Sequence, residues 1–219
     1  MRFALIVLGS ILLAGPAAAI SFTSTPSVAI SDNDPGAPAV DTIDTATTFS
    51  PDFTITSVSV EVSINHTWVG DLAIILRSPG GVELQLVARA GATHPDEGQG
   101  APFGNGANLI AANPILFSDA GTASAETLGS GGSPIPAGSF TADADGWSTD
   151  ITAFADYVGD LAGGIWTLEV GDYAGFDTGT LESWTLNLDA ISSIPEPSTG
   201  LLVLAGLVGF SARRRRELR

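Results

Sequence analysis

The chain has 219 residues, with 24 acidic residues against 8 basic ones and a formal net charge of −16 at pH 7. Most of the basic residues lie in the two terminal segments, so residues 20–194 carry 22 acidic side chains against only Arg77 and Arg89, a formal charge of −20. Such a chain repels nucleic acid and anionic lipid, and the absence of cysteine excludes disulfides and a thiol nucleophile.

Residues 1–19 have the features of a signal peptide. Arg2 supplies a positive charge, the run from Phe3 to Ala14 is apolar, and Gly15-Pro16 ends the run before Ala17-Ala18-Ala19. Signal peptidase requires small residues of this kind beside its cleavage site. We therefore predict an N-terminal signal helix, export, and cleavage after Ala19.

Alternation of apolar and polar residues predicts the first strands of the domain. A lead-in over residues 20–27 precedes an expected edge strand around Val28–Ile30, and Val58–Ile64 then alternates over a full strand. Leu72–Leu76 and Val82–Ala88 alternate on either side of a Ser-Pro-Gly-Gly turn, which predicts a hairpin.

Two further strands are expected near the end of the domain. Trp166–Val170 and Trp184–Leu188 alternate on either side of an acidic, glycine-bearing loop. Residues 89–108 and 129–146 are rich in glycine and proline and are predicted to be long surface loops, while residues 152–161 suit a short turn. The absence of a helical period predicts one all-β domain, an antiparallel sandwich or barrel.

A short apolar segment with a basic end follows the last strand. Residues 200–212 carry no charge, Arg213–Arg216 come next, and Pro195 and Pro197 precede the segment. A permanent span needs roughly 20 residues. Positive charge stays in the cytoplasm, which places residues 20–194 outside the membrane. An ordinary tail anchor is the alternative interpretation.

This tail resembles the PEP-CTERM sorting signal of Gram-negative bacteria. The resemblance covers residues 191–219, with Pro195-Glu196-Pro197 as the motif, a membrane helix over about 200–212 and a basic tail over 213–219. It implies processing by an exosortase at the motif, after transient anchoring in the inner membrane. The expected location is therefore the cell surface or the extracellular space, with signal peptidase and exosortase as processing partners.

The middle of the chain resembles the P domain, also called P/Homo B, of kexin- and furin-type proprotein convertases. Ile64–Leu72 and Ile74–Gly81 carry the first part of the resemblance, and Gly164–Val170 and Asp177–Leu186 match the closing hairpin of the family. Residues 28–190 are covered, and the resemblance implies a jelly-roll-like, galactose-binding-domain-like β-sandwich. In convertases this domain accompanies a subtilisin-like protease, whereas only the expected signal peptide precedes it here.

The motif residues have a structural interpretation. Gly70 allows a tight or positive-φ backbone, Asp71 can accept backbone N–H groups across the turn, and His66 is expected to pack around the same corner. We interpret this corner as a turn that sets the register of two core strands. Trp166 and Trp184 fall on the alternating apolar faces and are expected in the core.

Calcium is the one cofactor that the sequence suggests. Calcium takes oxygen ligands from flexible loops, and four acidic residues lie in loop-like contexts. The candidate ligands are Asp71, Asp119, Asp172 and Asp177. Ordinary turn-capping by these aspartates is the alternative.

No catalytic residues are predicted. Only His66 and His94 could serve as a histidine base, and neither accompanies a G-x-S-x-G or H-E-x-x-H pattern. We expect a non-catalytic surface module that binds or adheres in the extracellular polysaccharide matrix, through polysaccharide or a surface protein. The alternatives are an accessory to a subtilisin-type serine endopeptidase encoded elsewhere, and a hydrolase with an unrecognised site.

Overall fold

Two long strands lie at the centre of the molecule. In the computed structural model, which describes residues 17–92, 103–143 and 150–192, β4 (Phe53–His66) and β11 (Gly179–Ser192) pair antiparallel along their whole length. Buried Val58, Val60, Val62 and Ile64 alternate with polar residues on β4, so this strand buries one face as the pattern predicts.

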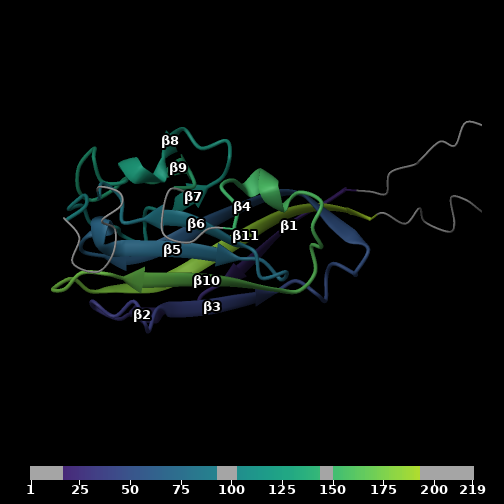
Figure 1. Cartoon of the computed structure of the whole chain (residues 1–219), viewed down its shortest axis with the longest axis horizontal. Helices are drawn as coiled ribbons and strands as arrows, with labels where there is room; N and C mark the ends of the chain where they lie inside the picture. Colours follow the sequence, from purple (N-terminus) through teal and green to yellow (C-terminus); the bar gives the residue numbers. More distant parts are fainter. Residues whose placement is uncertain (1–16, 93–102, 144–149, 193–219) are drawn as a thin grey trace, which may run out of the picture.

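The first sheet extends to both sides of this pair (Figure 1). Among the described residues, its strand order is β1-β11-β4-β7-β9-β8, and β2 also pairs with β11. The added strands are β1 (Ala17–Ser24), β2 (Val28–Ile30), β7 (Ile115–Phe117), β8 (Ala123–Ser124) and β9 (Gly138–Thr141).

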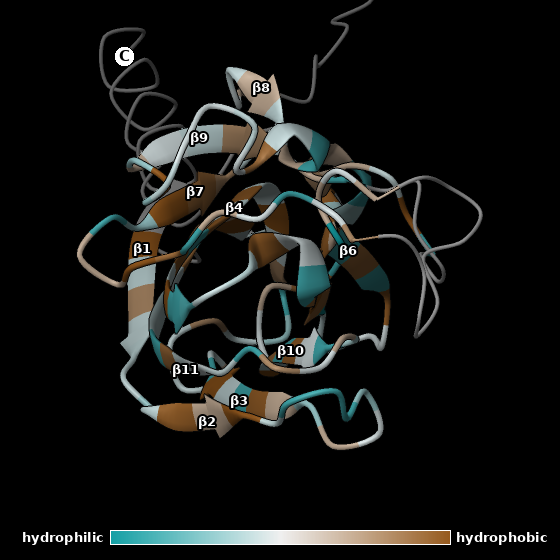
Figure 2. Ribbon diagram, turned by 90° about the vertical axis from the view of Figure 1, so that its left-hand side faces the viewer, coloured by the Kyte–Doolittle hydropathy of each residue, from teal (hydrophilic) through white to brown (hydrophobic). Residues whose placement is uncertain are grey.

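The second sheet faces the first across the core. Its order is β3-β10-β5-β6, and all of its pairs are antiparallel. The strands are β3 (Ala39–Asp44), β5 (Leu72–Arg77), β6 (Glu83–Ala88) and β10 (Ile165–Asp172). In Figure 2 the strands β4, β7 and β9 lie above β3 and β10, and brown apolar segments appear on strands of both layers. The all-β class with two sheets is therefore confirmed.

Three 3-10 turns connect the described strands. They are η1 (Val69–Asp71), η2 (Ala125–Thr127) and η3 (Phe154–Tyr157). The last of these lies within the predicted turn over residues 152–161.

Several expectations about the connections need correction. The lead-in over residues 20–27 contributes most of β1, which pairs with β11. The predicted surface loop over 129–146 contains buried Ile135 and strand β9, which runs parallel to β7 and β8. The predicted surface loop over 89–108 begins with two fully buried residues, Arg89 and Ala90. The sequence pattern does not reveal these features, because pairing and packing against distant segments of the chain set them.

Both ends of the described domain leave the sandwich together. Ala17 pairs with Ile191, and Figure 1 shows the start of β1 and the end of β11 at the same end of the sandwich. The predicted signal helix lies almost entirely before residue 17, and the predicted helix at 200–212 lies outside the described residues. Within the described segments, no helix is long and apolar enough to cross a bilayer.

Candidate functional site

The motif residues gather at the end of the sandwich where β4 ends and β11 begins. We call this the loop end and define it by residues 31–34, 66–71 and 172–179, together with the side chain of Arg89, which contacts Gly70. Gly179 pairs with both Ile30 and His66, so the three segments lie side by side. The loop end is opposite to the end at which the two termini leave (Figure 1).

His66 and Asp172 form a buried pair across the two sheets. The Nε2 atom of His66 lies 3.2 Å from Oδ2 of Asp172, and both side chains are fully buried. Its Nδ1 atom lies 2.9 Å from the carbonyl oxygen and 3.2 Å from the amide nitrogen of Trp68. Because both ring nitrogens are engaged and the ring is buried, His66 is placed to hold the corner rather than to exchange protons with a substrate.

Arg89 brings a guanidinium group into the same region. Its Nε donates to the carbonyl oxygen of Gly70 at 3.1 Å, and its Nη2 lies 3.9 Å from Oδ1 of Asp71. The backbone of Arg89 has a φ of +54°, which is unusual for a residue with a side chain. This conformation turns the chain after β6 and keeps the buried guanidinium beside Asp71.

Burial changes the acidity of Asp71. The pKa of its carboxyl is raised to about 6, chiefly by desolvation and also by the negative charges of Asp172 and Asp177, while Arg89 and His66 act in the opposite direction. Desolvation also lowers the pKa of Arg89. The loop end therefore contains a carboxyl group that gains its proton at about pH 6, well above the ordinary range of an aspartate.

Gly70 is required for close packing rather than for a positive φ. A Cβ atom at this position would lie 2.5 Å from the backbone of Gly104 and 2.6 Å from the amide nitrogen of Asn105. The amide of Gly70 donates to the Asn105 carbonyl at 3.0 Å. Asp71 does not cap the turn through its side chain as expected; instead its carbonyl oxygen accepts from Tyr173 at 2.9 Å.

The four predicted calcium ligands do not form one cluster. Asp71, Asp172 and Asp177 belong to the loop end, where Asp177 accepts from the Thr67 hydroxyl at 2.6 Å. Asp119 instead accepts from the amides of Phe154 and Ala155 and lies in a surface hollow with Ser59. Ser59 is seven residues before His66 on β4, or roughly 23 Å along the strand. Among the described residues, no group of three or more His, Asp or Glu side chains is arranged to hold a metal ion.

Both predicted core tryptophans are buried. Trp166 is 0 % exposed and packs edge-on against Tyr157 with ring centroids 5.3 Å apart. Trp184 is 1 % exposed, and its indole N–H donates to the Asp41 carboxylate at 2.7 Å. Asp41 belongs to β3, so Trp184 joins the first sheet to the second.

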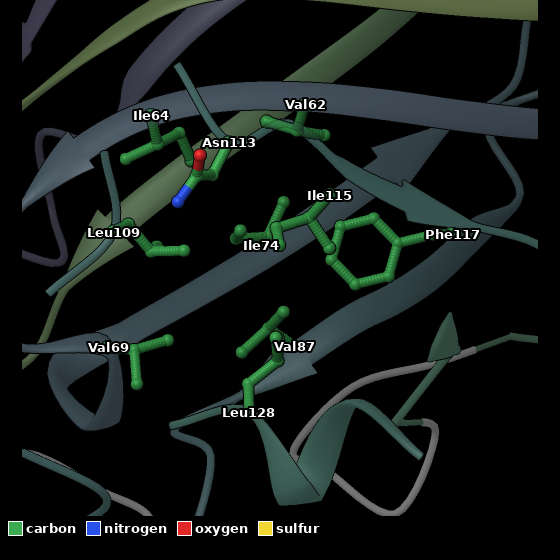
Figure 3. A pocket seen from close by; sticks show the side chains of 10 residues that line it. All are labelled: Val62, Ile64, Val69, Ile74, Val87, Leu109, Asn113, Ile115, Phe117 and Leu128. Carbon is green, nitrogen blue, oxygen red and sulfur yellow. The ribbon is translucent and has the colours of Figure 1, made fainter. Parts of the chain in front are cut away.

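A small cavity lies between the sheets (Figure 3). Its volume is about 10 Å³, which is room for one water molecule at most. Apart from Asn113 its lining is apolar, so the cavity is a packing defect of the core rather than a ligand site. The lining residues are Val62, Ile64, Val69, Ile74, Val87, Leu109, Asn113, Ile115, Phe117 and Leu128.

Sequence reasoning missed two features of the loop end. Arg89 falls in the segment that the sequence predicts to be a surface loop, although it is one of only two basic residues between positions 20 and 194, and such a residue is a signal for a specific ion pair. The sequence pattern does not indicate a role for Phe176, because a single phenylalanine in a glycine-bearing loop belongs to no alternating or helical pattern. The processing motif Pro195, Glu196 and Pro197 lies outside the described residues, as does His94.

Comparison with solved structures finds a serine protease of Aeromonas sobria. The match to its complex with the chaperone ORF2 has 20% identity and a TM-score of 0.44, and the match to the protease alone has 19% identity and a TM-score of 0.43. Each covers 80% of this chain but only 27% of the other, so the chain spans about a quarter of those proteins. Comparison with curated proteins finds no match.

Two family profiles match the chain. The proprotein convertase P-domain matches residues 55–103 and 140–188, and the PEP-CTERM protein-sorting motif matches residues 193–216. The two P-domain segments complete one sandwich, because β4 from the first pairs with β11 from the second and β5 pairs with β10. The sorting motif starts directly after β11, and such motifs indicate export and processing by an exosortase at the membrane of Gram-negative bacteria. The chain thus carries a proprotein convertase P domain that is followed by a PEP-CTERM protein-sorting motif.

Proposed function

We propose that the chain is a secreted, surface-sorted binding module without catalytic activity. The observation that carries this proposal is the order of its parts, a P domain whose last strand ends at Ser192 and a sorting motif that starts at residue 193. The buried and engaged state of His66 supports a structural role for the family motif. We propose in addition that the strands connect as in a jelly roll and that residues 1–19 are a signal peptide.

The sorting part is tested in cells that carry an exosortase. Replacement of Pro195, Glu196 and Pro197 by alanine in the full chain is expected to give a longer, membrane-retained form on immunoblots. Replacement of the neighbouring Ser198 and Thr199 by alanine is the matched control and is expected to leave processing unchanged. Identical processing of both variants would contradict a role for the motif.

The binding partner that we propose is extracellular polysaccharide or another surface protein. The loop end supports this, because it lies at the end of the sandwich opposite to the strand end that leads into the sorting motif. The 14 residues of β11 separate the loop end from the start of the sorting motif by roughly 45 Å. A tethered domain would thus present its loops away from the attachment point.

An accessory role in proteolysis is the second candidate. It is favoured by the match to a domain of proprotein convertases. Under this proposal the chain would bind a subtilisin-type serine endopeptidase encoded elsewhere and stabilise it. The test is the half-life of a co-expressed subtilisin-type protease of the same cell, which should lengthen when the chain is present. An unchanged half-life would count against it.

We propose further that the loop end works without calcium. The donors around its carboxylates are already protein groups: His66 and the Ala174 amide for Asp172, Thr67 for Asp177, and the nearby guanidinium for Asp71. Calcium would have to compete with these donors and with a buried cation. The melting temperature is expected to be the same in millimolar calcium and in chelator, and a calcium-dependent rise would restore the calcium hypothesis.

A further inference from the structure

Phe176 stands free at the tip of the loop between β10 and β11. Its exposure is 101 %, so nothing in the described domain covers the ring. Its backbone φ is +85°, a left-handed conformation that is strained for a residue with a side chain. Gly175 precedes it, and a glycine at position 176 would adopt the same conformation without strain.

The loop that presents this ring is braced on both sides. Asp32 accepts from the amide of Phe176 through both carboxylate oxygens, at 3.0 and 3.3 Å. On the other side Thr67 donates to Asp177 at 2.6 Å and accepts from the amide of Thr178 at 3.3 Å. The backbone that presents the exposed ring is therefore held in place, so ligand binding would order little of the loop backbone.

The charge around the ring has one sign. Asp32, Asp34 and Asp177 lie in the two loops that meet at Phe176, and the sequence has no lysine. Within the described segments, Arg89 is fully buried and Arg77 is paired with Glu83 and Glu169 on the strands. The loops beside Phe176 thus offer an aromatic face with carboxylates, and neither of the described arginines belongs to them.

We propose that the Phe176 loop binds a polysaccharide whose sugars carry free amino groups. One face of the sugar ring stacks on the phenyl ring, and the ammonium group faces the carboxylates of Asp32 and Asp177 and the ring face. This inference rests on the proposed function and specifies the chemistry of the partner. Polysaccharides that carry carboxylates are repelled by the same residues.

The surroundings favour a sugar over a protein partner. A stable protein interface buries more than about 1,000 Å² and contains several apolar anchors. The residues that adjoin Phe176 are glycine and polar residues, namely Asp32, Asn33, Gly175 and Asp177. A single ring with hydrogen-bonding neighbours is sufficient for one sugar unit.

The test is calorimetric titration of the purified protein with three hexasaccharides at about pH 6. They are the glucosamine hexamer, its fully N-acetylated form, and a uronic acid hexamer. Binding is expected for the glucosamine hexamer and is expected to weaken at least tenfold in 0.5 M salt or on acetylation, with no binding of the uronic acid hexamer. Equal affinity for the amino and acetylated forms would overturn the role of the carboxylates.

Variants separate the binding role from folding. Phe176→Gly is expected to raise the melting temperature, because glycine suits the positive φ, and to lower affinity at least tenfold. Phe176→Trp should retain binding. Asp32→Asn keeps an oxygen acceptor for the Phe176 amide and should lower the affinity for the glucosamine hexamer alone. Val158→Ala, at an exposed apolar residue in the hollow with Asp119, is the control and should bind as wild type.

Unchanged affinity in Phe176→Gly, or no binding of any hexamer by the wild type, would overturn the inference. If the wild type binds a protein instead of sugar, and Phe176→Gly no longer binds that protein, the sugar inference is overturned in favour of a protein partner. The proposed function is tested independently, because the immunoblot that measures processing of the sorting motif in cells requires no added ligand.

Discussion

Four ionisable side chains share the buried part of the loop end. Asp71 and Asp172 supply the carboxylates, and Arg89 and His66 supply the cationic or ionisable nitrogen groups. Burial makes each charge costly unless a partner compensates it, so the protonation of one member changes the stability contributed by the others. Asp71 has the weakest compensation, because its Oδ1 accepts no hydrogen bond from the described residues and lies 3.9 Å from the guanidinium.

Asp71→Asn is expected to change how stability depends on pH. The folded pKa of about 6 lies above the ordinary value of 3.8, so the native state holds this proton more tightly than the unfolded chain. The stabilisation from Asp71 is complete below about pH 4 and is lost as the pH rises through 6, at a cost of roughly 1 kcal/mol between pH 5 and 7. Urea unfolding at both pH values should show this loss in wild type and not in the variant. Parallel losses in the two proteins would contradict the raised pKa.

Gly70→Ala is expected to destabilise the domain by about 2–3 kcal/mol, because a Cβ atom would overlap the backbone of Gly104 and Asn105. The comparison is Gly131→Ala, where an added Cβ meets no atom within 4 Å. That control should leave stability unchanged or slightly higher. The measurement is the melting temperature of each variant relative to wild type. Similar values for both variants would show that residues 69–71 and 104–105 can move apart without loss of stability.

At the scale of elements, the two sheets are joined by more than apolar contact. Trp184 extends from β11 in the first sheet to Asp41 on β3 in the second, with an N–O distance of 2.7 Å. The other buried tryptophan, Trp166, has an indole N–H without a hydrogen-bond partner in the described part of the chain. The two side chains therefore bury similar volumes with different polar consequences.

Trp184→Phe is expected to cost more stability than Trp166→Phe, by about 1–2 kcal/mol. The first substitution removes a hydrogen bond to a carboxylate, while the second removes a buried donor that has no acceptor. Both lose comparable ring volume, so the difference isolates the polar contribution. Denaturant unfolding of the two variants measures it, and a larger loss for Trp166→Phe would show that packing dominates at both positions.

The strands that sequence could predict are those with a clear period of two. β4, β10 and β11 bury every second residue over most of their length, whereas β5 and β6 are buried on both faces over most of theirs; the sequence predicts all five. β7 and β9 are only three and four residues long, and their parallel pairing needs a partner distant in the chain. At the site, sequence predicted His66, Gly70 and Asp71 at one corner, but not the ion pair with Arg89, because burial of a charged residue depends on packing.

At the scale of the whole molecule, charge is the dominant feature. Residues 20–194 carry a formal charge of −20, and both described arginines are already paired with acidic residues. Acidic side chains therefore far outnumber basic ones in this part of the chain, and their mutual repulsion opposes the compact state. Exposed ion pairs contribute little in return, since Arg77 with Glu83 and Glu169 is partly open to solvent.

Added salt is consequently expected to stabilise this protein. The Debye length falls from about 30 Å at 0.01 M to about 8 Å at 0.15 M ionic strength, so repulsion between distant carboxylates is screened. A gain of about 1 kcal/mol corresponds to a rise of roughly 2–4 °C in melting temperature for a domain of this size. The measurement is thermal unfolding in both buffers, with a neutral osmolyte as control for effects other than screening. A fall in melting temperature with salt would mean that the ion pairs of the loop end, rather than surface repulsion, dominate the electrostatic free energy of folding.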